Sequence, residues 1–110
     1  MMEEKLKEAL GKTGIPFFHI RHPQAEHEYI LYKYSESAES FSDNEEDVTS
    51  YLIYLNLFCQ SNFGKRKKAI KKYMKECGFI KKDIPEPYMV RETREVNQSF
   101  IYSYIERTQD

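Results

Sequence analysis

The sequence predicts an α+β domain: a mostly antiparallel sheet of four or five strands, packed by one main helix at about 64–77 and a short N-terminal helix. The length of 110 residues suits one compact domain, which we place at residues 1–110. Hydrophobic residues make up 40% of the chain, and many of them alternate in short runs, as they do in strands. Only one long helical crossover is available, so most neighbouring strands must be antiparallel.

The N-terminal segment Met2–Leu10 has the apolar spacing of a short helix. Glu3 and Glu4 lie in its first turn, where the helix dipole favours negative charge, and Gly11 can end it. We expect a helix that needs the body of the protein for its stability.

Two strands are predicted next, one beginning at Phe17 and one over Tyr29–Tyr34. Pro16 has no amide donor, so it belongs at the beginning or edge of the first strand. In the second strand the face that carries Ile30 and Tyr32 is the better candidate for the core.

The segment Ser35–Asp47 is predicted to be a long, exposed acidic loop, because serines and acids surround Phe41 without any apolar period. Val48–Cys59, in contrast, is apolar on both faces. This pattern predicts a central strand that a helix or another subunit covers on each side. Its length indicates a protruding hairpin or an intersubunit sheet.

The main helix is predicted over Gly64–Cys77, where the apolar residues share one side and Gly78 supplies the end. Two short strands follow, and a proline-containing segment separates them. A final strand alternates well and stops at a polar end. These three strands are expected at Phe79–Lys82, Tyr88–Glu92 and Ser99–Glu106.

The net charge of −1 conceals a strong division along the chain. Residues 1–60 carry 5 Lys and Arg against 11 Asp and Glu, or −6, while residues 61–110 carry 12 against 7, or +5. Two opposed fields of this kind can steer a protein toward a charged partner or toward another copy of itself.

The strongest electrostatic feature is a stripe along the outer side of the main helix, formed by Lys67, Lys68, Lys71, Lys72 and Lys75. Like charges four residues apart disfavour an isolated helix by about 0.2–0.5 kcal/mol per pair, so an anionic partner would relieve repulsion. Three explanations remain open. The stripe can meet nucleic acid, the acidic segment of this chain or a neighbouring copy, or only solvent.

Catalytic and metal-binding motifs are missing from the sequence. His19, His22 and His27 lack the spacing and the companions of a metal site, and we expect surface histidines. No nucleophile elbow or phosphate loop appears, so we expect neither an enzyme nor a cofactor. Cys59 and Cys77 are expected to be reduced core residues of a cytoplasmic protein.

Neither a membrane span nor a signal peptide is expected. The longest apolar run, Tyr51–Leu55, is far shorter than the roughly 20 residues that a span requires. Met1–Gly14 lacks the apolar stretch of a signal peptide.

Aromatic residues are abundant, with nine Tyr and seven Phe. Tyrosine suits association surfaces because its ring buries apolar area while its hydroxyl keeps a polar contact. The rings therefore indicate self-assembly, although they can also simply line the two faces of the sheet.

Several segments together resemble the small tail-completion proteins of long-tailed bacteriophages. The similarity covers most of the chain from Ile15 to Glu106 and contains no catalytic signature. The segments that carry it are Ile15–Phe18, Tyr29–Glu45, Ser50–Phe58, Lys71–Phe79 and the closing strand at Phe100–Tyr104. The dense lysine stripe and the Pro85–Pro87 insertion depart from the family pattern.

The resemblance implies a structural tail terminator, which forms a ring, commonly a hexamer, and joins the tail tube to the head connector. Its expected partners are copies of itself, the tail tube protein and connector proteins, in the bacterial cytoplasm during assembly and then in the virion tail. A small nucleic-acid-binding accessory protein that uses Lys65–Lys75 is the alternative.

A head-to-tail ring would give the charge division a use, because it joins two different surfaces of each protomer. We therefore expect Glu36–Asp47 of one copy to lie near the basic helix, or another positive patch, of the next. The candidate interaction residues are Glu36, Glu39, Phe41, Asp43, Glu45, Glu46, Asp47, Lys67, Lys68, Lys71, Lys72 and Lys75.

Overall fold

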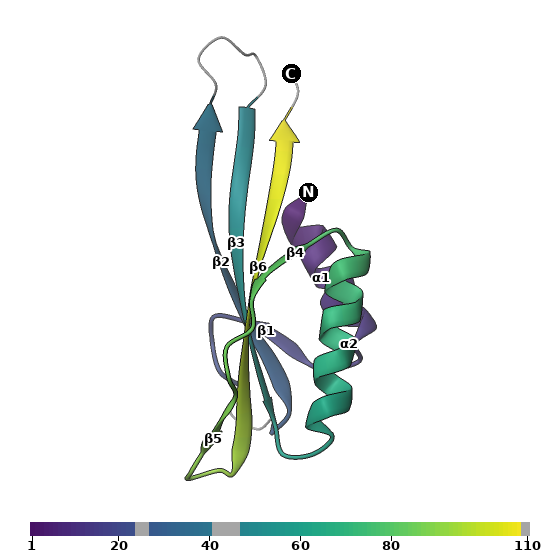
Figure 1. The fold of residues 1–110 in the computed structure, drawn as a ribbon, viewed down its shortest axis with the longest axis vertical. Coiled ribbons are helices and arrows are strands. Elements are labelled where there is room, and N and C mark those ends of the chain that lie inside the picture. The colour runs from purple at the N-terminus through teal and green to yellow at the C-terminus, as the bar shows by residue number, and fades with distance from the viewer. Residues whose placement is uncertain (24–26, 41–46, 109–110) are drawn as a thin grey trace.

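Two helices pack on one face of a single sheet in the computed structural model, which describes residues 1–23, 27–40 and 47–108 (Figure 1). The α+β prediction is confirmed. The sheet has six strands, where four or five were expected. In chain order the elements are α1 (Met2–Lys12), β1 (Phe17–His19), β2 (Tyr29–Ser40), β3 (Asp47–Cys59), α2 (Phe63–Glu76), β4 (Ile80–Asp83), β5 (Tyr88–Val90) and β6 (Glu95–Thr108).

The strands lie in the order β1-β2-β3-β6-β4, and β5 also pairs with β6. Only the β1–β2 pair is parallel among the described strands, as the prediction of a mostly antiparallel sheet required. The central strand is β3, which pairs with β2 and β6 along their whole shared length. These three long strands form the frame on which every other element is placed.

The core lies between the helices and one face of the sheet. Helix α1 packs its predicted apolar face into the core, and α2 contributes Ile70 and Met74. Alternate residues of β3 meet them, and Ile53, Leu55 and Leu57 are fully buried. Each fully buried aliphatic side chain contributes roughly 1.5–3 kcal/mol by leaving water, so this layer holds the two helices on the sheet.

The second face of β3 carries no helix in the described part of the chain. Leu52 is 39% exposed, and across the neighbouring strands Ile80 and Ile105 are 55% and 57% exposed. The expectation of cover on both sides is therefore not met within one chain. We call this surface the open face, and it carries Leu31, Leu52, Tyr54, Ile80, Ile101 and Ile105.

The long strands continue past the helices, as Figure 1 shows. The α-amino group of Met1 lies 3.5 Å from the Glu106 carboxylate, which marks where α1 begins against the sheet. Beyond this level β2 runs to Ser40, β3 starts at Asp47, and Ser40 pairs with Asp47. We call the part of the sheet beyond the paired residues Glu36, Tyr51 and Tyr104 the arm.

The predicted loop at 35–47 is wrong for most of its length, because the described part of that segment is strand. Residues 41–46 lie outside the described residues. The physical reason is that neither helix of the described chain packs on the arm (Figure 1). Strand residues there need no apolar alternation, and the end of β2 consists of serines and acids with one alanine, Ala38.

The arm makes the molecule long and narrow, with principal extents of 53 × 24 × 23 Å. Its radius of gyration is 15.5 Å, against about 13 Å for a compact domain of this length. Neither helix in the described part is long and apolar enough to cross a membrane.

Candidate functional site

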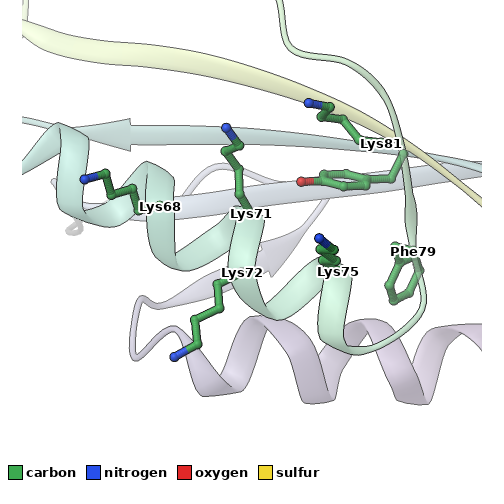
Figure 2. Close-up of a pocket in the computed structure, with 7 residues that line it drawn as sticks. Lys68, Lys71, Lys72, Lys75, Phe79 and Lys81 are labelled. Carbon is green, nitrogen blue, oxygen red and sulfur yellow. The ribbon is translucent and has the colours of Figure 1, made fainter.

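The predicted lysine stripe forms one wall of a surface groove of about 610 Å³ (Figure 2). Helix α2 supplies that wall, and β4 and β6 supply the rest. We call it the lysine groove, and its lining residues are Lys68, Lys71, Lys72, Lys75, Phe79, Lys81 and Tyr102.

Helix α2 places its lysines outward because Ile70 and Met74 anchor the opposite side in the core. At its C-terminus the amide of Phe79 donates to the carbonyl of Met74 at 3.0 Å, with Gly78 between them at a φ of 90°. Only glycine adopts this conformation without strain, so Gly78 allows the abrupt return of the chain.

The chain that turns back after Gly78 brings a fifth lysine, Lys81, to the groove. The Phe79 side chain is 4% exposed, with its ring centroid 5.0 Å from that of Tyr104, and it fastens the start of β4 to the sheet. Strand β4 then pairs Lys81 with Tyr102. As a result Lys81 faces the lysines of α2 across the groove.

The lysines of the groove have no carboxylate partner in the described part of the chain. The two ion pairs found there lie elsewhere, between Arg66 and Glu28 at 2.6 Å and between Met1 and Glu106. The ammonium group of Lys72 lies 5.2 Å from the centroid of the Tyr73 ring, and Figure 2 shows it pointing away from Lys71 and Lys81. The four remaining lysines that line the groove are Lys68, Lys71, Lys75 and Lys81.

Tyr102 is the buried polar member of the groove. Its side chain is 2% exposed, and burial raises the pKa of its phenol to about 12. The hydroxyl therefore keeps its proton at neutral pH and can donate a hydrogen bond. No hydrogen bond joins it to another residue within 1–23, 27–40 or 47–108.

The predicted interaction residues divide into two groups. Lys68, Lys71, Lys72 and Lys75 come together in the groove, while the Lys67 ammonium lies 5.8 Å from the ring centroid of Phe63 on another side of α2. Their role in binding stays a prediction.

The acidic candidates do not approach the groove where their side chains are described. Glu36 lines a separate hollow with Tyr34 and Tyr51 at the foot of the arm. The pKa of Tyr51 is raised by burial, and further by the nearby Glu106 and Glu36 carboxylates. Phe41, Asp43, Glu45 and Glu46, with the side chains of Glu39 and Asp47, lie outside the described part.

Sequence reasoning missed Phe79, Lys81 and Tyr102 as members of the groove. No local pattern identifies them, because Lys81 and Tyr102 meet only through the pairing of β4 with β6. The glycine that ends α2 was the one available signal, since it places the following residues back against the helix.

The histidines and cysteines form no second candidate site. His22 Nδ1 lies 2.9 Å from the Tyr29 hydroxyl, and the ring of His19 stacks on Tyr32. Both cysteines are free and buried, and burial raises the pKa of each thiol. Within the described ranges no three His, Cys, Asp or Glu residues gather where they could hold a metal ion.

The sides of the arm form the other surface available for contacts. On β2, β1 pairs only with residues up to Tyr32. On β6, β4 pairs with Ile101–Ser103, and beyond Ser103 no further described strand joins the sheet on that side. The arm therefore presents two sheet edges together with the open face.

Comparison with known proteins adds no relative. No protein-family model matches the chain, and no curated protein matches it.

Proposed function

We propose that the protein is a structural subunit of a bacteriophage or prophage tail, which completes the tail tube as a ring and joins it to the head connector. It works through contacts with copies of itself, with the tail tube protein and with connector proteins. It assembles in the cytoplasm of the bacterial host and remains in the virion tail. The sequence resemblance suggests this role and a ring of six.

The observation that carries the proposal is the arm. Strands β2, β3 and β6 extend past both helices, and no described strand lies along β2 beyond Tyr32 or along β6 beyond Ser103. Exposed sheet edges pair readily with other chains, so proteins usually shorten or cover them. A long arm with two edges is suited to pairing between copies.

The open face supports the same role. Ile105 lies on β6 toward the arm, beside the edge that β4 leaves uncovered, and Ile80 and Leu52 continue the apolar surface on neighbouring strands. The apolar surface is thus continuous with the sheet edge, and a second copy that paired with the edge would also cover it. Contacts between two different sides of each copy form a ring when the rotation from copy to copy closes, and the proposal requires that it does.

The test is to measure the mass of the full chain by light scattering and to image it by electron microscopy, alone and with purified tail tubes. We expect rings, either free or on the tube ends. Ile105→Lys places a charge on an exposed position, so it should leave the fold intact and prevent assembly.

Met89→Lys is the matched control, since Met89 is 61% exposed on β5 and lies outside the open face. It should assemble like the unmodified chain. A chain that forms no ring in either condition would contradict the proposal. If Ile105→Lys forms rings as readily as the unmodified chain, the open face is not part of the interface between copies.

A further inference from the structure

We infer that the lysine groove binds the phosphate backbone of a nucleic acid strand without reading its sequence. This inference does not depend on the proposed ring, because the groove lies between α2, β4 and β6, whereas the proposed contacts between copies use the arm and the open face.

The first support is the concentration of unpartnered positive charge on rigid elements. Lys68, Lys71 and Lys75 project from one helix, and Lys81 faces them from a strand. The ion pairs in the described part involve none of them. A bound anion would offset the repulsion among these like charges, which the fold places along one groove.

The second support is the Tyr102 hydroxyl. The ring of Tyr102 is buried, but its hydroxyl oxygen is not among the buried polar atoms that lack a partner, and no described residue accepts a hydrogen bond from it. The hydroxyl therefore reaches solvent in the groove, where a ligand can accept its hydrogen bond. It lines the groove and stays protonated, so it adds one neutral donor to the four ammonium groups. An oxyanion in the groove can accept from both kinds of donor.

The shape of the groove favours an extended polyanion. All five lysines are exposed, so an anion in the groove keeps contact with water and gains chiefly by releasing counterions. Lys68 to Lys75 span about 10 Å along the helix axis, which is about three phosphate steps along one strand of a duplex.

The side chains also indicate binding without base recognition. The groove holds lysines and no arginine, so it lacks the bidentate fork that reads guanine. Phe79 and Tyr102 are too deeply buried to stack on bases. Contacts to the phosphates alone fix position and carry no sequence information.

Fluorescence anisotropy of the full chain with labelled duplexes of two unrelated sequences tests the inference. The two duplexes should bind equally. Four phosphate contacts predict that log K falls with log salt at a slope of about −3.6, so affinity should drop roughly 150-fold between about 50 mM and about 200 mM salt.

The triple variant Lys68→Gln, Lys71→Gln, Lys75→Gln leaves Lys81 as the one ammonium group of the four, with Lys72 directed away from it (Figure 2). Its slope should fall to about −0.9, a loss of only about 3.5-fold over the same salt range, from a much weaker starting affinity. The matched control is Lys5→Gln, Lys7→Gln, Lys12→Gln on α1, which removes the same charge outside the groove. It should retain most of the affinity and a slope close to that of the unmodified chain.

Tyr102→Phe removes only the hydroxyl and keeps the ring. Binding should weaken about two- to tenfold while the salt slope stays the same. This result separates a built site from a diffuse positive surface, which would not respond to the loss of a neutral donor.

Three outcomes would overturn the inference. Equal loss of binding in the groove variant and in the α1 control would mean that net charge alone attracts nucleic acid. Equal affinity for a free nucleoside triphosphate would assign the groove to a small ligand. Unchanged duplex binding with weakened self-association in the groove variant would assign it to an acidic segment of a second copy.

Discussion

We call the part of the molecule in which the helices cover the sheet the body. The body and the arm are built from the same three strands, yet different interactions stabilise them. In the body, β3 buries Ile53, Leu55 and Leu57 completely beneath the helices. In the arm the same ladder continues from Tyr51 to Asp47 with no helix above it. The body is thus stabilised by backbone hydrogen bonds and by apolar burial. The arm is stabilised by the backbone hydrogen bonds between its strands and by any partner that covers it. This difference predicts that the arm opens locally at a lower free energy than the body.

Hydrogen exchange gives the largest expected contrast between the two regions. In the isolated chain, amides at Ile53–Leu57 should exchange only when the whole domain unfolds, which requires a free energy of about 5–15 kcal/mol. Amides at Val48–Ser50 should exchange through local opening, at a small fraction of that free energy. Mass spectrometry of peptides from β3 would measure both. Assembly should raise protection in the arm alone. Equal protection of the two segments in a demonstrated monomer would contradict the division.

The same difference explains which parts of the fold the sequence could predict. Wherever a helix packs on the sheet, burial imposes a period, and Met2, Leu6, Ile70 and Met74 appear at the predicted positions in the core. In the arm no helix of the described chain covers the sheet (Figure 1), so burial imposes no period there and β2 beyond Tyr34 was indistinguishable from a loop.

Part of the candidate site was predictable for a related reason. The lysines of α2 follow from helical spacing opposite an apolar face. Lys81 and Tyr102 could not be predicted as neighbours, because their register depends on the tight turn after α2, and a register shift between Lys81 and Asp83 follows directly after the pair. Irregularities of this kind leave no pattern in the sequence.

A pair of leucines on one strand compares the two faces of β3 directly. Leu55 is fully buried under the helices, and Leu52 is 39% exposed on the open face. Leu55→Ala should lower the free energy of unfolding by about 2–5 kcal/mol through lost burial and a cavity. Leu52→Ala should cost less than about 1 kcal/mol in the monomer. Urea unfolding of both variants measures the difference, and equal losses would mean that the open face is covered in solution.

Two tyrosines extend the comparison to pH. The pKa of Tyr102, in the body, is raised by burial to about 12, from the ordinary 10.0. The pKa of Tyr51, at the foot of the arm, is also raised, first by burial and then by the Glu106 and Glu36 carboxylates. Tyr51 is only half-buried, so solvent weakens these effects and its contribution to stability should be smaller.

The direction of the Tyr102 effect follows from proton linkage. Above pH 10 the unfolded chain releases the phenolic proton while the folded chain retains it, so stability falls as pH rises. The contribution of Tyr102 is fully present below pH 10, and it is lost progressively up to about pH 12. The total loss should be about 2–3 kcal/mol.

Urea unfolding at a series of pH values from neutral to strongly alkaline checks this prediction. Tyr102→Phe should remove the Tyr102 part of the alkaline loss, while other groups with a raised pKa, such as Tyr29 and Cys59, keep the rest. Tyr51→Phe should change the alkaline loss less than Tyr102→Phe does. At neutral pH Tyr102→Phe should cost less than about 1 kcal/mol, because the hydroxyl has no acceptor among the described residues. A large loss of unfolding free energy at neutral pH would show that the hydroxyl stabilises the core. The groove would then lack this hydrogen-bond donor. A small neutral cost with a flattened alkaline limb would leave that hydroxyl available for an anion.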